Sequence, residues 1–123
     1  MTIKQCIDDL LMRGCDDWVD ASEVAFVAKE IGHAQSAEEI RDLSLKMIRE
    51  VVQQGLMEIG DLPEEGRRLM LWPMTPQKCL DRVEREWNVL ARNPTLGEIC
   101  WLQNTDKGKA LGEELFKQRG AGQ

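Results

Sequence analysis

The sequence has few of the residues on which most catalytic sites depend. Its 123 residues include no tyrosine, two phenylalanines and a single histidine, His33. We find no glycine-rich phosphate loop, no G-x-S-x-G nucleophile motif and no nucleophile signature near the histidine. The sequence therefore predicts a protein that is not an enzyme and that uses no cofactor.

The cysteines form no recognisable framework. Cys6, Cys15, Cys79 and Cys100 contain no C-x-x-C pair, and no cysteine or histidine lies at zinc-site spacing. Cys6 lies on an apolar helical stripe and Cys100 in a strand-like segment, so we expect free buried thiols and a reducing compartment. No apolar run approaches the ~18 residues of a membrane span, and no signal peptide is visible. A cytoplasmic protein without a metal site is expected.

Basic residues are scarce in the N-terminal half. Residues 1–62 hold 13 acidic and 6 basic residues, residues 63–123 hold 9 and 10, and the net charge is −6. Surplus negative charge repels phosphate backbones and attracts basic proteins, although many proteins are acidic only for solubility. Both interpretations stay open from the sequence.

Capping residues and helical periodicity predict three helices near the N-terminus. An amphipathic stripe over residues 3–11 predicts the first, with its end at Gly14. Asp20 and Ser36 each open a capping box, which predicts the starts of the second and third helices. Gly55 is expected to end the third helix in a left-handed conformation.

The rest of the chain alternates short strands with helices. Thr75-Pro76 predicts the start of a helix over residues 76–90, and Thr105 is expected to cap a last helix over residues 106–117. Residues 118–123 are expected to form a frayed tail. Three short segments are expected to form strands, the first two as a hairpin: residues 56–59, 69–72 and 99–102. We expect one domain over residues 1–123, mainly α with a small β-sheet.

Two motifs and the order of elements resemble a winged-helix domain. The last strand leads into T-x-x-G-x-x-L, formed here by Thr105, Gly108 and Leu111. The segment QQGLMEIGD resembles the third helix of such domains leaving for the wing. Asn104 departs from the pattern, because a hydrophobic residue usually precedes the threonine. The helix over residues 76–90 is an insertion that a minimal winged helix lacks.

The resemblance implies a DNA-binding alternative. In winged-helix regulators the third helix enters the major groove, and the loop of the wing can touch the minor groove. The candidate DNA contacts are Arg41, Lys46, Arg49, Arg67 and Arg68. Acidic residues are mixed with these bases, whereas DNA binding requires the neutralisation of several phosphates. A dimeric winged-helix transcription regulator is therefore the alternative function.

Acidic residues around one tryptophan suggest a different function. The candidate partner-binding residues are Asp8, Asp9, Asp16, Asp17, Trp18 and Asp20. Carboxylates would steer a basic partner and an indole would anchor it, although Trp18 could equally close the core between two helices. The preferred function is a small acidic module that binds a protein. Its most concrete form resembles a bacterial immunity or antitoxin protein that blocks a basic toxin domain, such as a nuclease, by occlusion. The oligomeric state stays open, with a dimer among the options.

Overall fold

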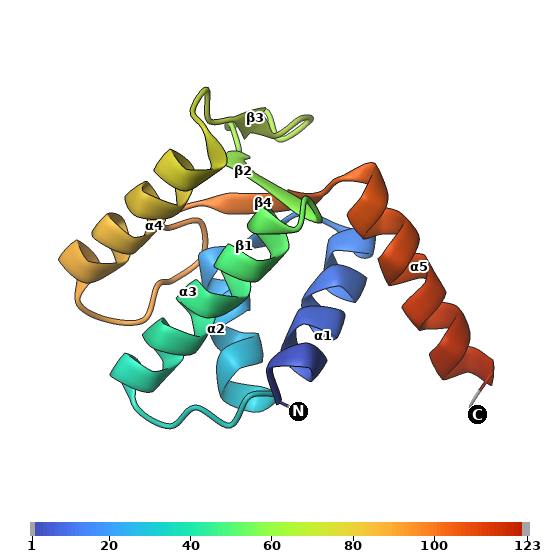
Figure 1. Cartoon of the computed structure of the whole chain (residues 1–123). Helices are drawn as coiled ribbons and strands as arrows, with labels where there is room; N and C mark the ends of the chain where they lie inside the picture. Colours follow the sequence, from blue (N-terminus) through green and yellow to red (C-terminus); the bar gives the residue numbers. More distant parts are fainter. Residues whose placement is uncertain (1, 122–123) are drawn as a thin grey trace.

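The computed structural model describes residues 2–121, which form five α-helices and four short strands (Figure 1). In chain order these elements are α1 (Thr2–Asp16), β1 (Val19–Asp20), α2 (Ala21–Glu30), α3 (Ala37–Gln53), β2 (Met57–Asp61), β3 (Met70–Leu71), α4 (Pro76–Leu90), β4 (Trp101–Asn104) and α5 (Asp106–Ala121). The fold is mainly α with a small antiparallel sheet, which confirms the predicted class. Over this range no helix is both long enough and apolar enough to cross a membrane.

Helices α1, α2 and α3 pack on one another and place their apolar stripes in a common core. Leu10, Val27 and Met47 are fully buried, one from each helix. The predicted N-caps of α2 and α3 are confirmed. The Asp20 carboxylate accepts a hydrogen bond from the Glu23 amide, and Ser36 Oγ accepts one from the Glu39 amide, both at 3.0 Å. Local capping therefore sets the starts of α2 and α3.

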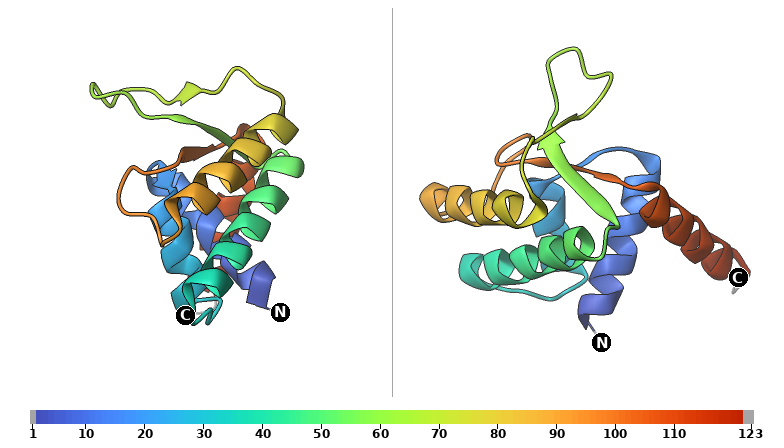
Figure 2. Two further views of the ribbon diagram at one scale, coloured as in Figure 1. Left: turned by 90° about the vertical axis from the view of Figure 1, so that its left-hand side faces the viewer. Right: turned by 45° about the horizontal axis from the view of Figure 1, so that its top comes forward.

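The sheet has the strand order β1-β4-β2-β3, with every pair antiparallel. Strand β4 lies between β1 and β2, so Leu102 is opposite both Val19 and Ile59. Strand β3 pairs with only the last two residues of β2, which confirms the predicted hairpin. The loop over residues 62–69 projects from the body of the molecule (Figure 2).

One predicted strand needs correction, and one strand was not predicted. The last strand begins at Trp101 and not at residue 99, because Ile99 has a left-handed φ of 71° and the Cys100 amide donates to the Glu98 carbonyl at 2.9 Å. A turn therefore occupies the first half of the predicted segment. Strand β1 was not predicted at all. Two residues carry no alternation pattern, and their pairing depends on β4, far along the chain.

Gly14 does not end the first helix, which continues to Asp16. A side chain at this position would overlap the Asn104 side chain. Asn104 Nδ2 donates to the Leu11 carbonyl oxygen at 3.0 Å. The residue that departs from the winged-helix pattern thus connects β4 to α1.

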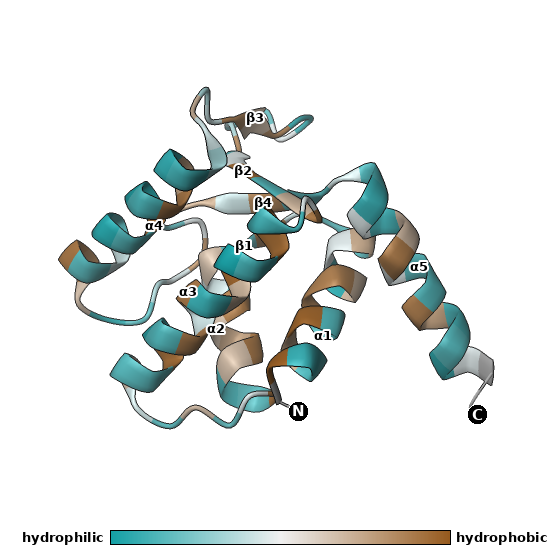
Figure 3. Ribbon diagram, viewed as in Figure 1, coloured by the Kyte–Doolittle hydropathy of each residue, from teal (hydrophilic) through white to brown (hydrophobic). Residues whose placement is uncertain are grey.

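Helices α4 and α5 lie on opposite sides of the three-helix core (Figure 1). Helix α4 has the predicted bounds, and Thr75 Oγ1 accepts a hydrogen bond from the Lys78 amide at 3.3 Å. Helix α5 continues to Ala121, so the predicted tail is helical up to that residue. Residues 122–123 of the predicted tail lie outside the described range. The outer faces of α3 and α4 are hydrophilic, whereas α5 carries hydrophobic residues in its middle (Figure 3).

Two glycines allow α5 to approach its neighbours closely. A Cβ atom on Gly108 would overlap the main-chain carbonyl oxygen of Leu56. A Cβ atom on Gly112 would lie 2.9 Å from the Leu11 carbonyl oxygen and 2.5 Å from Cys15 Sγ. Contacts this short exclude larger side chains, so Gly108 sets the position of α5 against Leu56 and Gly112 sets it against α1.

Candidate functional site

The predicted acidic residues of α1 lie in different environments. Asp8 pairs with Lys4 at 2.8 Å, and Asp9 pairs with Arg13 at 2.6 Å. Asp16 is exposed and, within residues 2–121, makes no ion pair. Asp17 is also exposed, and its Oδ1 accepts a hydrogen bond from the Trp18 amide at 2.7 Å. Asp16 is thus the predicted carboxylate most available to a partner.

Asp20 is buried, and this corrects its prediction as a partner-binding residue. Only 2% of its surface is exposed. Its carboxylate accepts hydrogen bonds from Ser22 Oγ at 2.8 Å, from the Glu23 amide at 3.0 Å and from the Gly97 amide at 2.7 Å. The carboxylate that caps α2 is therefore covered by the loop before β4, and its role is structural.

Trp18 was considered either as part of the core or as an exposed anchor, and its environment is intermediate. It is partly exposed and does not belong to the buried core, in contrast to Trp72 and Trp87, which are buried. Trp101 is also partly exposed, because only one face of β4 contacts the core. Trp18 can contribute only part of its ring to a binding surface.

Arg13, which the sequence did not single out, connects α1 to α2. Its Nε donates to Asp9 Oδ2 at 2.6 Å and its Nη1 donates to Glu23 Oε2 at 3.1 Å. Its guanidinium lies 5.3 Å from the centroid of the Phe26 ring. Burial acts to lower the pKa of Arg13, but the hydrogen bonds to Asp9 and Glu23 outweigh it and raise this pKa. Arg13 therefore stays charged and holds the two helices together.

An open groove of about 370 Å³ lies beside Arg13, between α1, α2 and α5. We call it the α1–α5 groove, and its lining residues are Asp9, Met12, Arg13, Asp16, Glu23 and Phe116. Phe116 is 42% exposed, and the neighbouring Phe26 is 50% exposed. The groove thus combines three carboxylates with one guanidinium and an exposed aromatic ring.

The phenylalanines of this surface were missed, although one left a signal in the sequence. Phe26 falls outside the apolar stripe of α2 that includes Val24, Val27 and Ala28. An aromatic residue off the buried stripe of a helix is expected at the surface. Phe116 left no such signal, since its exposure depends on how α5 crosses α1.

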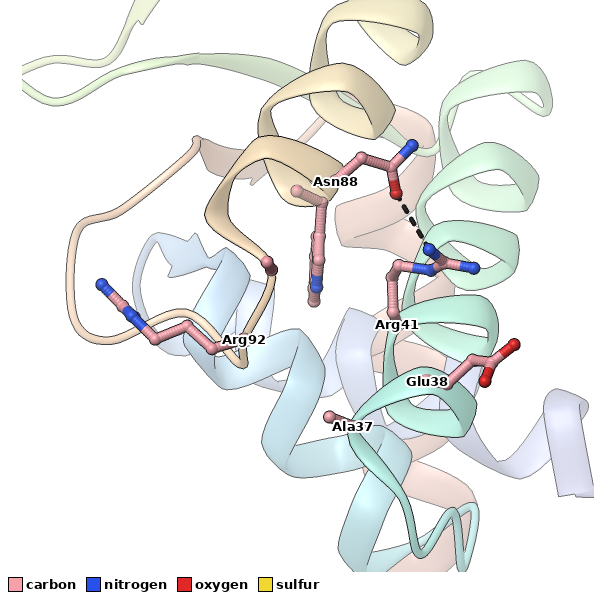
Figure 4. Close-up of a pocket in the computed structure, with 7 residues that line it drawn as sticks. Ala37, Glu38, Arg41, Asn88 and Arg92 are labelled. Atoms are coloured by element: carbon pink, nitrogen blue, oxygen red, sulfur yellow. Dashed lines mark hydrogen bonds between the residues drawn. The ribbon is translucent and has the colours of Figure 1, made fainter.

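The predicted DNA contacts come from α3 and the hairpin loop, and acidic residues are interspersed with them. Arg41 Nη2 pairs with Asp42 at 2.8 Å, and its Nη1 donates to Asn88 Oδ1 of α4 at 3.0 Å (Figure 4). Lys46 and Arg49 are exposed elsewhere on α3. Arg67 and Arg68 are exposed in the hairpin loop, where Glu64 and Glu65 are also exposed. Each group of bases is accompanied by acids.

A pocket of about 330 Å³ separates α3 from the end of α4, as Figure 4 shows. Its lining residues are Ala37, Glu38, Arg41, Trp87, Asn88, Ala91 and Arg92. The Arg92 guanidinium points away from Arg41 and binds both carboxylate oxygens of Glu98 at 2.8 Å. Both arginines at this pocket are therefore already engaged by groups of the protein.

The part of the chain that the structure describes offers neither a metal-binding cluster nor an activated cysteine. Within residues 2–121 no three His, Cys, Asp or Glu residues are placed to hold a metal ion. Burial raises the pKa of the Cys6, Cys79 and Cys100 thiols, and a protonated thiol is a poor nucleophile. No known protein family, curated protein or solved structure matches the chain. Function is therefore inferred from the exposure, charge and shape of its surfaces.

The ion pair with Arg92 makes the Glu98 carboxyl group unusually acidic. The hydrogen bond from Arg92, followed by those from the Thr95 amide and hydroxyl, lowers the pKa of Glu98 to about 2. Because the folded pKa lies below the unfolded one, the pair favours the ordered loop above about pH 4.3 and loses this effect as the pH falls towards 2. NMR titration of the Glu98 carboxyl should show a midpoint near 2. Arg92→Ala should raise the midpoint, whereas Arg67→Ala should not. An unchanged midpoint in Arg92→Ala would contradict the assignment.

Proposed function

We propose that the protein is a small acidic binding protein that neutralises a basic partner protein by covering it, without catalysis of its own. Its most concrete form is an immunity or antitoxin-like protein that acts in the cytoplasm on a toxin domain such as a nuclease. One observation carries the proposal: the α1–α5 groove places exposed Phe116 beside Asp9, Asp16 and Glu23, with one cation among them. An exposed aromatic ring among carboxylates is suited to a basic protein surface.

In this mechanism the acidic residues and the rings have different tasks. The carboxylates of Asp16 and Asp17, both exposed, attract the partner and orient it during encounter. Phe26 and Phe116 then lose water on contact and supply apolar area. For a nuclease partner, the carboxylates occupy the basic residues that otherwise bind phosphates, so the active site is blocked.

The alternative, a winged-helix DNA-binding regulator, has less support. The element order still favours a winged-helix-like framework, but α4 packs along the flank of α3, and Arg41 is bonded to Asn88 across that contact. The major groove of DNA is about 12 Å wide and admits one helix. The axes of packed helices lie about 8–10 Å apart, so α3 and α4 together are wider than the groove. The exposed bases of α3 and of the hairpin are also interspersed with acidic residues, which weakens their attraction to phosphates. We therefore rank protein binding first.

Affinity purification of the tagged protein from its own cells tests the proposal. A basic protein should be retained, and the double variant Asp16→Lys/Asp17→Lys should weaken its binding by about 10- to 100-fold, since each exchange converts a modest attraction into a repulsion. Glu64→Lys/Glu65→Lys changes the charge equally in the hairpin loop and should leave the affinity unchanged. Equal effects of both double variants would remove the proposed site. Retention of bulk DNA at low salt in a gel-shift would instead favour the alternative.

A further inference from the structure

We divide the surface at the α1–α5 groove into two sides: the first holds Arg13 with its partners and the neighbouring Phe26, and the second holds Asp16 and Phe116. On the first side Arg13 contacts the carboxylates of Asp9 and Glu23 and lies 5.3 Å from the ring centroid of Phe26. A guanidinium within about 6 Å of an aromatic face is attracted by the ring. This side shows how the local arrangement binds a guanidinium group.

The second side offers the same two kinds of group without a cation. Asp16 and Phe116 both line the groove, and within residues 2–121 Asp16 forms no ion pair and Phe116 no cation–π contact. The lining as a whole has three carboxylates and one guanidinium, so its net charge is negative and favours a cation. Met12 and the Phe116 ring make part of the wall apolar.

The position of Phe116 is well defined by the fold. Gly112 contacts Leu11 and Cys15 of α1 so closely that α5 has little freedom there. Phe116 follows one helical turn later and lines the groove with Asp9 and Met12. The backbone that carries this ring therefore needs little further ordering when a ligand binds.

We propose that the α1–α5 groove takes an arginine side chain of the partner protein, in preference to lysine. Its guanidinium packs against the face of Phe116 and donates hydrogen bonds to Asp16. A guanidinium is planar, weakly hydrated and able to stack, whereas an ammonium is compact and strongly hydrated, so a site made of a ring and a carboxylate distinguishes the two. The inference rests on the proposed function and adds the chemical identity of the group that the partner inserts.

Two short peptides of equal length and charge test this preference. One alternates alanine with arginine, and the other alternates alanine with lysine. Calorimetry should give about fivefold tighter binding of the arginine peptide. In NMR titrations its addition should shift the Phe116 ring signals and the amides of Asp9 and Asp16. Equal affinities, or shifts confined to α3 and the hairpin, would overturn the inference.

Two single variants distinguish the contribution of the Phe116 ring to peptide affinity from that of the Asp16 charge. Phe116→Leu keeps an apolar side chain but removes the ring face, so it should reduce the arginine affinity about fivefold and leave the lysine affinity unchanged. Asp16→Asn should weaken both peptides, whereas Asp42→Asn on α3 should weaken neither. An arginine preference that survives in Phe116→Leu would also overturn the inference. If the peptide tests fail but a basic partner is still captured, only the arginine site is refuted. Capture of no basic partner refutes the proposed function.

Discussion

Replacement of Asp20 with alanine is expected to lower the free energy of unfolding by about 3 kcal/mol, from the loss of a helix N-cap and of charge-assisted buried hydrogen bonds. The carboxylate caps α2 through the Glu23 amide and also holds the Gly97 amide at 2.7 Å. Its removal leaves that second amide, on the exposed Gly97, without its acceptor in the protein. Urea denaturation followed by circular dichroism measures the change.

Two variants control this experiment. Asp20→Asn keeps one side-chain oxygen and should cost roughly half as much, since it can satisfy only one of the two amides well. Asp16→Ala removes an exposed carboxylate and should change stability by less than about 0.5 kcal/mol. A stable Asp20→Ala protein that has lost its partner would contradict the structural role and restore Asp20 as a binding residue.

Gly108→Ala is expected to destabilise the fold by about 2–3 kcal/mol, the usual cost of overpacking. In an unhindered helix the same exchange favours folding by up to about 1 kcal/mol, so the predicted sign is reversed. The new methyl group would overlap the Leu56 carbonyl oxygen, which belongs to the main chain and cannot rotate away. Thr105 also ties this turn to the Gly55 carbonyl oxygen at 2.6 Å, which limits any shift of α5.

Gly120→Ala is the matched control, because no atom lies within 4 Å of the Cβ position there. It should leave stability unchanged or raise it slightly. Thermal or urea unfolding of both variants gives the comparison. Since α5 carries Phe116, Gly108→Ala should also disturb the α1–α5 groove. If both alanines stabilise the protein equally, α5 does not lie against Leu56 as described.

The elements predicted well are those that local chemistry determines. Ser36 and Thr75 cap helices through their own side chains, and Gly55 adopts a φ of 71° that ends α3. Each of these signals involves residues a few positions apart. The sequence could not reveal β1 or the contact of Asn104 with Leu11, because their partners lie far away along the chain. Tertiary pairing decides these features, and no local pattern encodes it.

The acidic residues predicted to bind a partner lie in different places in the structure. Asp9 and Asp16 do line one groove, but Asp8 is paired with Lys4 and Asp20 is buried. Spacing along α1 indicated which acids share a region, yet it could not show which of them the loop before β4 would cover. The aromatic contribution comes from Phe26 and Phe116 more than from the predicted Trp18, because the relative placement of α1, α2 and α5 decides which rings reach the surface.

The α1–α5 groove draws its walls from the two ends of the chain, with Asp9 on the first helix and Phe116 on the last. Because α1 leaves the ribosome well before α5, a growing chain carries the acids of the groove before it carries the Phe116 ring. The docking of α5 also depends on Gly108 and Gly112, which accept no side chain. The groove therefore forms only once α5 has been synthesised and has docked on α1.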